Sequence, residues 1–240
     1  METPGQDLRL EQNRLLRALS PAMRQRLLPL LEPYPLTLRD ILIEHDVPIP
    51  WVYFPLDGVV SLISTLHDGT KVEVATIGKE GMGGLPLFLR ATSIPFTTFV
   101  QVAGEALRMR AAAFAALLDE VNSDFSQLLY LYTQALFNQL GQHVVCNRLH
   151  PIEQRCARWL LMTQDRMGHD EFQLTHEFLA QMLGVRRASV TEVAGRLQKA
   201  GLIRYRRGVI QVRDRTGLEA ASCECYGVIK QQYDRLLGPA

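Results

Sequence analysis

Residues 175–212 read THEFLAQMLGVRRASVTEVAGRLQKAGLIRYRRGVIQV, and the order of residue types in this segment predicts two helices joined by a tight turn. Thr175 is a typical N-cap for a first short helix that ends at Leu183. Gly184 follows, and only glycine adopts the left-handed conformation of such a turn without cost. A second helix is expected from Arg187 to Ala200. The segment therefore predicts a helix-turn-helix.

The two expected helices carry apolar residues wherever they must pack together. These residues are Leu179, Ala180, Leu183, Val185, Val190, Val193 and Leu197. With Val190, Val193 and Leu197 turned inward, the second helix presents side chains suited to contacts with bases and phosphates. The outward residues are Arg186, Arg187, Ser189, Thr191 and Glu192, with Arg196 further along. An ordinary helical hairpin with a solvated charged face is the alternative.

Two short basic strands around Gly208 are expected directly after the second helix, which is the place of a wing. Arg204, Arg206 and Arg207 would hold phosphates there without reading the base sequence. The segment from Arg186 to Arg215 holds nine Lys and Arg against two acidic residues, a charge of +7. Because the chain carries +1, the remainder carries −6. A basic block of this kind favours double-stranded DNA as the partner and predicts an affinity that falls with salt.

Upstream of the helix-turn-helix, the residue types and the elements they predict change along the chain. Residues 1–32 are expected to form a helical arm, with a break at Ser20-Pro21. Residues 33–112 contain short β-rich runs separated by Pro and Gly, and two Asp-Gly pairs at 57–58 and 68–69 indicate hairpin turns. The expected strands are Leu36–Ile43, Val52–Phe54, Val59–Leu66, Val72–Ile77, Thr97–Val102 and Ala106–Met109. This pattern predicts an antiparallel sandwich or barrel that serves as a sensor domain.

A long helical stretch at residues 113–149, broken near Asn122-Ser123, is predicted to link this domain to a DNA-binding domain at 150–240 that ends in a helix. Apolar residues in the stretch step by alternating four and three positions, and a second apolar line follows another face. A helix that is apolar on two faces must be covered from two directions, which favours a homodimer over an internal helix of a monomer. The candidate dimer contacts are Phe125, Leu128, Leu129, Tyr132, Leu136 and Leu140.

Taken together, the sequence resembles the Crp/Fnr family of bacterial regulators. The resemblance rests on the β-rich texture with Gly58, Asp68-Gly69 and the run EGMGGL at 80–85, and on the helix-turn-helix residues quoted above. It implies an α+β fold: an N-terminal antiparallel β-barrel (a jelly-roll of the cyclic-nucleotide-binding type), a long dimerisation helix and a C-terminal winged helix-turn-helix. It further implies a transcription regulator that binds a pseudo-palindromic site as a homodimer, with RNA polymerase as a candidate partner.

The sequence departs from the family pattern for cyclic nucleotides. Members that bind them hold the ribose with a Gly-Glu pair and the phosphate with an Arg followed by Ser or Thr about ten residues later. Here Leu85 follows Gly84, the stretch IPFTT at 94–98 lacks an arginine, and Arg90 stands at the wrong offset. A buried phosphate without a guanidinium loses its main charge-assisted bonds, so tight binding of cyclic AMP or cyclic GMP is not expected. For an unknown small-molecule effector, the candidate pocket comprises Met82, Gly83, Gly84, Leu85, Arg90, Thr97 and Thr98.

Other functions find less support in the sequence. Cys146, His150, Cys223 and Cys225 suggest a composite zinc site, but their spacings are not those of structural zinc motifs, so no metal or other cofactor is expected. A cupin-like metal enzyme needs about three converging histidines, whereas the barrel offers only His45 and His67. We therefore expect no enzymatic activity. An interaction module that does not bind DNA is the other alternative. Without a signal peptide or a long apolar run, the chain is expected in the cytoplasm and not in a membrane.

Overall fold

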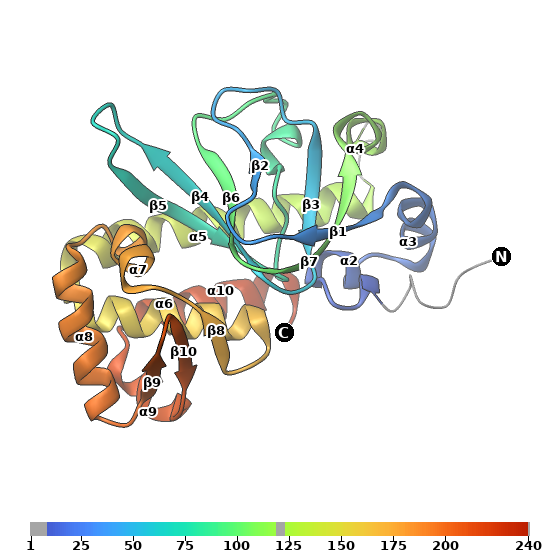
Figure 1. Ribbon diagram of the computed structural model, residues 1–240. Helices are drawn as coiled ribbons and strands as arrows, with labels where there is room; N and C mark the ends of the chain where they lie inside the picture. Colours follow the sequence, from blue (N-terminus) through green and yellow to red (C-terminus); the bar gives the residue numbers. More distant parts are fainter. Residues whose placement is uncertain (1–8, 119–122, 240) are drawn as a thin grey trace.

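The computed structural model describes residues 9–118 and 123–239. An antiparallel β domain lies at one end, a C-terminal domain lies at the other, and one long helix runs past both (Figure 1). The predicted mixed fold, with an N-terminal sheet domain, a long helix and a C-terminal helix-turn-helix, is confirmed.

Between residues 11 and 32 the N-terminal arm contains the short helices α2 (Arg14–Arg17) and α3 (Pro21–Leu27), followed by a 3₁₀ turn at Leu28–Leu30. The Asn13 side chain caps α2 and the Ser20 side chain caps α3. The expected break at Ser20-Pro21 is confirmed, because Pro21 begins the second helix after its cap. Residues 1–8 of the expected arm lie outside the described residues.

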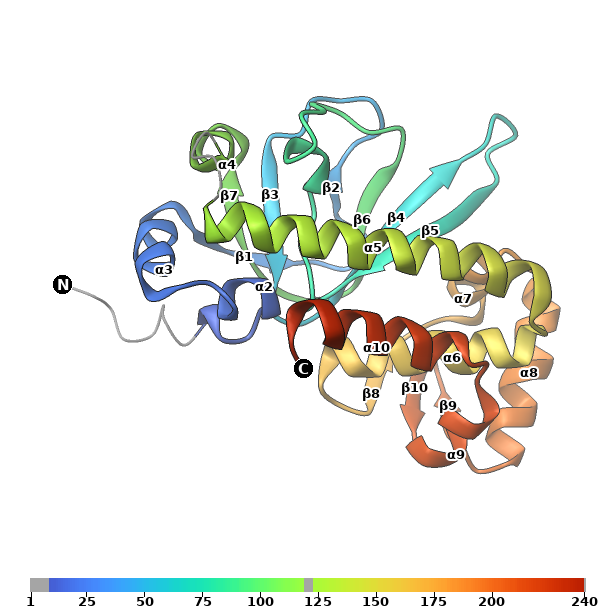
Figure 2. The ribbon, with the colours of Figure 1, turned by 180° about the vertical axis from the view of Figure 1, so that it is seen from behind.

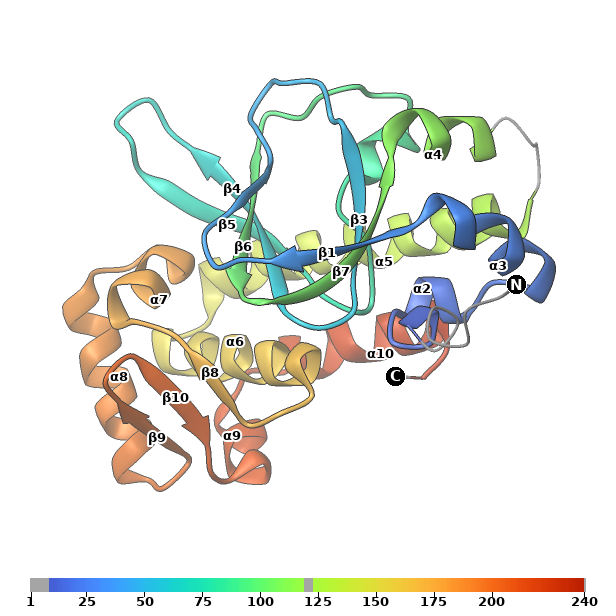
Figure 3. The same cartoon turned by 45° about the vertical axis from the view of Figure 1, so that its right-hand side comes forward.

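The β domain consists of two antiparallel sheets (Figure 1, Figure 3). The first has the order β1-β7-β3, made of β1 (Glu32–Leu36), β7 (Gly104–Arg110) and β3 (Trp51–Pro55). The second has the order β2-β6-β4-β5, made of β2 (Ile41–Ile43), β6 (Thr97–Val102), β4 (Val59–Thr65) and β5 (Lys71–Ile77). Apolar side chains from both sheets form one shared core: Leu36, Ile43, Tyr53, Val60, Ile77, Val100 and Ala106.

The expectation of a single strand over Leu36–Ile43 is wrong. The chain turns at Arg39, whose φ is 74°, and the two halves join different sheets as β1 and β2. Both Asp-Gly pairs form turns, with Gly58 and Gly69 at positive φ of 78° and 83°. The turn at 68–69 joins the expected hairpin, β4 with β5. The turn at 57–58 connects β3 to β4, which lie in different sheets, so the expectation of a hairpin there is wrong. At Gly58 a Cβ would lie 2.9 Å from the Val102 carbonyl oxygen, so this turn requires glycine for space as well as for conformation.

Helix α4 (Ala111–Leu118) leaves the β domain, and α5 (Asp124–Leu149) then runs between the β domain and the C-terminal domain (Figure 2). Ser123 caps α5, which agrees with the expected break; Asn122 lies outside the described residues. On α5, the Tyr132 hydroxyl donates a 3.1 Å hydrogen bond to the Met82 carbonyl, and a Cβ at Gly81 would collide with the Tyr132 ring. The N-terminal part of α5 is thereby fixed against its own β domain.

The C-terminal domain begins after His150. Its elements are α6 (Ile152–Met167), β8 (Glu171–Gln173), α7 (His176–Leu183), α8 (Arg187–Lys199), β9 (Ile203–Arg206), β10 (Val209–Val212), α9 (Arg215–Ala221) and α10 (Cys225–Leu237). Helix α10 leaves this domain and packs along α5 (Figure 2). Within the described ranges, no helix combines the length and apolarity needed to cross a membrane.

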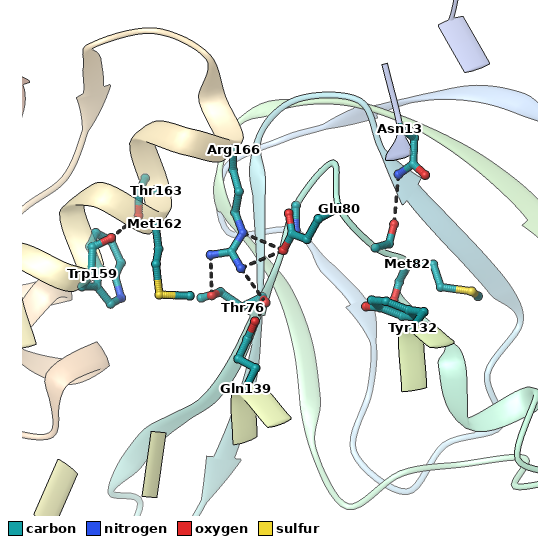
Figure 4. A network of polar contacts seen from close by, with 12 residues as sticks. Asn13, Thr76, Glu80, Met82, Tyr132, Gln139, Trp159, Met162, Thr163 and Arg166 are labelled. Atoms are coloured by element: carbon teal, nitrogen blue, oxygen red, sulfur yellow. Dashed lines mark hydrogen bonds and ion pairs between the residues drawn. The ribbon is translucent and has the colours of Figure 1, made fainter. Parts of the chain in front are cut away.

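A buried polar network joins α6 to the β domain (Figure 4). The Arg166 guanidinium contacts Glu80 Oε1 at 2.7 and 2.8 Å and donates to Thr76 Oγ1 at 2.7 Å. Gln139 of α5 donates to the Thr76 carbonyl at 3.0 Å. Burial acts to raise the pKa of Glu80, but Arg166 outweighs it and holds the pKa below its ordinary value. The first helix of the C-terminal domain is therefore held to the sheet by a charged pair as well as by apolar contacts.

Candidate nucleic-acid interface

Helices α7 and α8 form the predicted helix-turn-helix. The Thr175 hydroxyl accepts a hydrogen bond from the Phe178 N–H at 3.2 Å and so caps α7. Gly184 ends α7 in the left-handed conformation, with φ 62° and ψ 41°, and α8 begins three residues later. No Cβ clash exists at Gly184, so its backbone conformation alone explains the glycine.

The apolar face of α8 turns inward as the sequence predicts. Val190, Val193 and Leu197 are at most 2% exposed and belong to the same core as Leu179 and Leu183 of α7. Because these positions fix the rotation of α8 about its axis, the intervening polar positions must face solvent. This rotation is the basis for every role assigned to the outer face.

The outer face of α8 presents most of the predicted DNA-binding side chains. Arg186, Arg187, Thr191 and Glu192 are exposed, and Ser189 is half-buried. Arg187 is 70% exposed and faces Glu177 of α7 at 3.8 Å, a distance at which a solvated ion pair is weak. The helix lies at the outer edge of the molecule (Figure 1), so its charged side chains can reach a partner outside the chain.

Arg196 differs from the other predicted contacts. Its Nε lies 2.6 Å from Glu153 Oε2 on α6, and its Nη1 lies 4.0 Å from Glu192. The side chain is about half exposed. Arg196 thus fastens α8 to α6 in this structure, and its position is on the flank of the helix that faces α6.

The predicted wing is present as β9 and β10, which pair in register from Val209↔Arg206 to Val212↔Ile203. Arg207 and Gly208 form the two-residue turn, both with positive φ, at 50° and 79°. Ile203 is buried, whereas Arg204 and Arg206 point to the other face and are exposed together with Arg207. Strand β8 adds a third strand beside β10.

His176 is a contributor that the sequence analysis missed. Its ring stacks on Tyr205 of the wing, with centroids 4.1 Å apart and an interplanar angle of 21°, and its Nδ1 lies 3.1 Å from Thr191 Oγ1. Burial and the nearby Arg187 both lower the pKa of His176, so the ring is neutral at pH 7. It therefore connects α7, α8 and the wing. Only the fold reveals this role, since the three residues are far apart in sequence.

The candidate effector residues do not line one common space. Thr97 and Thr98 are consecutive in β6 and so face opposite sides of the sheet. Thr97 lines a cavity of about 460 Å³ between the sheet and α7, while Thr98 is 1% exposed. Gly84, with φ 91°, is followed by the short 3₁₀ turn Leu85–Leu87, in which Leu85 is buried.

The remaining candidates differ from these in burial and position. Met82 is fully buried in the core that α5 covers, and Gly83 forms a β-bridge with Tyr53. Arg90 is exposed, with φ 65°.

The candidate dimer contacts require a correction. Phe125, Leu128, Leu129 and Tyr132 are at most 8% exposed within a single chain, because the arm and the β domain cover them. Leu136 and Leu140 are half-buried. The exposed apolar side chains of α5 lie on another face and nearer its C-terminus: Tyr130, Leu131, Phe137, Val144, Val145 and Leu149. The spacing of apolar residues was right for a two-faced helix, but it did not show which face the chain itself covers.

Comparison with known proteins agrees with this geometry. Residues 154–221 match the family described as the Crp-like helix-turn-helix domain. Among solved structures, FixK2 from Bradyrhizobium japonicum is 16% identical with a TM-score of 0.68, over 80% of this chain and 98% of its own. The c-di-GMP-responsive regulator CLP from Xanthomonas campestris is 16% identical with a TM-score of 0.63, over 80% of this chain and 99% of its own.

A transcriptional regulator of the CRP family from Thermus thermophilus is 15% identical with a TM-score of 0.62, over 80% of this chain and 96% of its own. Comparison with curated proteins gave no match. The resemblance noted from the sequence is thus confirmed in the overall fold and in the DNA-binding module. The chain has the fold of the Crp/Fnr regulators, and its residues 154–221 match the Crp-like helix-turn-helix domain.

Proposed function

We propose that this protein is a transcription regulator that binds double-stranded DNA sequence-specifically, as a homodimer on a pseudo-palindromic site. The observation that carries the proposal is the rotation of α8, which buries Val190, Val193 and Leu197 and leaves Arg186 and Arg187 exposed. A helix of this kind fits the major groove, where arginine makes bidentate contacts with guanine and glutamate accepts from cytosine.

Two sets of side chains are assigned different tasks at the groove. Arg187 and Glu192 on α8 read base edges, whereas Arg206 and Arg207 in the wing hold phosphates. Exchange of a reading residue therefore changes which sequences are preferred. Loss of a wing arginine weakens binding to all sequences about equally and lowers the salt dependence.

A second copy of the chain is the proposed cover for the exposed face of α5. Six positions on this face, Tyr130, Gln134, Phe137, Gly141, Val144 and Arg148, recur at alternating steps of four and three, the spacing of a two-stranded coiled coil. Phe137 and Val144 are 70% and 71% exposed in the single chain. Apolar side chains this exposed on one stripe favour association, and Gly141 allows two helices to approach closely.

Selection of bound sequences from a random DNA pool tests the proposal most directly. The expected result is an enriched site with two inverted half-sites whose centres lie about 34 Å apart, one helical turn. Affinity for this site should fall steeply between 50 and 200 mM salt, by roughly 10³-fold if about six phosphates are contacted. A pool with no enriched sequence, or an affinity independent of salt, contradicts DNA recognition.

The mass of the chain in solution tests the dimer separately. A Phe137→Glu variant should be monomeric by light scattering, because it places a charge in the proposed seam, and it should lose tight binding to the full site. Leu66→Glu is the matched control, since Leu66 is an exposed apolar residue in the turn between β4 and β5. A Phe137→Glu variant that remains dimeric shows that the second copy docks elsewhere.

A further inference from the structure

Four metal-ligating side chains meet where α5 ends and α10 begins. Cys146 and His150 lie one turn apart at the end of α5, and Cys223 and Cys225 flank the start of α10. The three sulfur atoms and one imidazole nitrogen all lie within 4.8 Å of one another. The spacing along the sequence hides this cluster, because Cys146 and Cys223 are 77 positions apart.

Two distances within this cluster are close to those of a tetrahedral metal centre. Cys146 Sγ lies 3.5 Å from Cys223 Sγ, and Cys225 Sγ lies 3.4 Å from His150 Nδ1. Zinc bonds of about 2.3 Å to sulfur and about 2.0 Å to nitrogen place neighbouring ligand atoms about 3.5–3.8 Å apart in a tetrahedron. These two distances lie within a few tenths of an ångström of the tetrahedral values and no pair of ligand atoms is more than 4.8 Å apart, so an ion fits after side-chain shifts of up to about 1 Å.

The orientation of His150 also matches a ligand. Its Nδ1 faces the sulfur atoms, and its Nε2 lies 3.2 Å from the Glu224 carboxylate. Metal-binding histidines usually direct the second ring nitrogen to a carboxylate, which fixes the ring and makes the ligand nitrogen more basic. Glu224 is 73% exposed, and together with Cys223 it lines a surface pocket on this side.

The surroundings suit an anionic centre. The three cysteines are at most 3% exposed and form an apolar cluster of their own. Gln142 Nε2 donates to Cys225 Sγ at 3.1 Å, and the buried Arg155 and Arg158 guanidiniums interact electrostatically with Cys146. Three thiolates, one neutral imidazole and a divalent ion carry a net charge of −1, which these cations compensate.

We propose that Cys146, His150, Cys223 and Cys225 bind one Zn²⁺ ion per chain as a Cys₃His site. Three thiolates and one imidazole in a tetrahedron are the donor set that zinc prefers, and a site with four protein ligands leaves no open position for catalysis. A Cys146–Cys223 disulfide accounts for the cluster less well. The two sulfur atoms lie well beyond the bond length of about 2.05 Å, and this pairing leaves Cys225 and His150 without a role.

The position of this zinc site gives it a structural role. His150 and Pro151 are the two residues between α5 and α6, where the C-terminal domain starts. The ion ties the first residue of α10 to this hinge, and Arg155, next to the site, donates to the Leu183 carbonyl at the end of α7. Zinc therefore holds the helix-turn-helix in a fixed orientation relative to α5.

The metal content of the full chain tests the proposal. Protein purified under reducing conditions and loaded with Zn²⁺ should hold one ion per chain after removal of weakly bound metal. Cobalt substitution should give the intense thiolate-to-Co²⁺ absorption and the visible bands of a tetrahedral site. Cys223→Ser should lose the ion, whereas Cys156→Ser, which removes a buried cysteine of α6 outside the cluster, should retain it. Zinc that is absent from the wild type, or that Cys223→Ser retains in full, overturns the proposal.

A second variant keeps the test valid even if Cys223→Ser fails to fold. Glu224→Gln changes an exposed side chain and leaves all four ligands, yet it should weaken zinc binding roughly 10–100-fold, because the carboxylate orients His150. The nearby exposed Glu219→Gln is the control and should leave the affinity unchanged. Equal affinities in both variants contradict the proposed ligand role of His150. None of these readouts depends on DNA, so they distinguish failure of this proposal from failure of the proposed function.

Discussion

The arginines of α6 and those of α8 and the wing are the same residue type in two opposite environments. Arg155, Arg158 and Arg166 on α6 are at most 9% exposed. Arg187 on α8 is 70% exposed, and the wing arginines are exposed as well. A count of positive charges along the sequence does not separate the two groups. Burial does, because a buried guanidinium needs partners within the chain and an exposed one can exchange its water for phosphate.

The buried group holds the C-terminal domain to the rest of the molecule. Arg166 bonds Glu80 and Thr76 of the β domain, and Arg155 bonds the carbonyl at the end of α7. The exposed group contributes little to the fold, since its ion pairs lie in water. On the proposed function, folding and DNA binding thus depend on different arginines. Substitution of a buried arginine should lower the stability and leave DNA binding by the folded protein unchanged, whereas substitution of an exposed arginine should weaken DNA binding and leave the stability unchanged.

The largest effect is expected for Arg166→Ala. Removal of the guanidinium leaves Glu80 buried without its charge partner, which typically costs 3–5 kcal/mol of unfolding free energy. Chemical denaturation should show this loss as a lower midpoint. Arg186→Ala is the matched control, because Arg186 is exposed and surface changes of this kind stay within about 0.5 kcal/mol. Equal destabilisation by the two variants contradicts the comparison.

A double variant identifies the cause of the loss at Arg166. Glu80→Gln removes the orphaned charge, so Arg166→Met combined with Glu80→Gln should recover part of the stability lost in Arg166→Met alone. If the double variant is as unstable as the sum of both singles, the loss comes from packing rather than from the charged pair.

The second effect concerns Glu73, which lies beside the buried arginines. Burial raises the pKa of Glu73 from its ordinary value of 4.5 to about 7, against hydrogen bonds from Ser61 and Trp159 that lower it. Ser61 Oγ lies 2.9 Å from Glu73 Oε2, and Trp159 Nε1 donates to Oε1 at 3.1 Å. The folded chain therefore binds a proton that the unfolded chain has released between pH 4.5 and 7.

This difference fixes the sign of the pH dependence. A raised pKa in the folded state contributes stability below pH 4.5 that is lost as the pH rises through 7. Glu73→Gln keeps the shape and imitates the protonated acid, so it should match the wild type near pH 4.5 and be more stable at pH 8, by up to about 3 kcal/mol. Unfolding curves of both proteins at several pH values measure this. A constant difference across the range contradicts the assignment to Glu73.

The sequence predicted the helix-turn-helix almost residue by residue because its signals are local. An N-cap at Thr175, a left-handed glycine at 184 and the spacing of Val190, Val193 and Leu197 all act within one or two turns. The wing was predicted for the same reason, because a two-residue turn joins two short strands whose side chains alternate between buried and more exposed positions. Local chemistry of this kind leaves little for the rest of the chain to change.

Features that depend on contacts between distant segments were not visible in the same way. The face of α5 that the chain covers depends on the placement of the arm and the β domain, so the sequence alone assigned Phe125 and Tyr132 to a partner. The cluster at Cys146 and Cys223 depends on α10 running back along α5. In both cases the sequence showed the residue types, but only the three-dimensional path of the chain determines which residues they contact.

The smallest effect separates two arginines that the sequence assigned to the same surface. Arg196 pairs with Glu153 at 2.6 Å, whereas Arg206 lies in the wing and points to solvent. Arg206→Gln should lower the slope of log affinity against log salt by about 1, since one phosphate contact is lost. Arg196→Gln should leave this slope unchanged and cost about 0.2–1 kcal/mol of stability, as exposed ion pairs do.

Both variants are measured in one DNA titration series from 50 to 200 mM salt, the range in which counterion release changes affinity most visibly. If Arg196→Gln lowers the slope as much as Arg206→Gln, Arg196 leaves Glu153 when DNA binds, and the flank of α8 belongs to the interface after all.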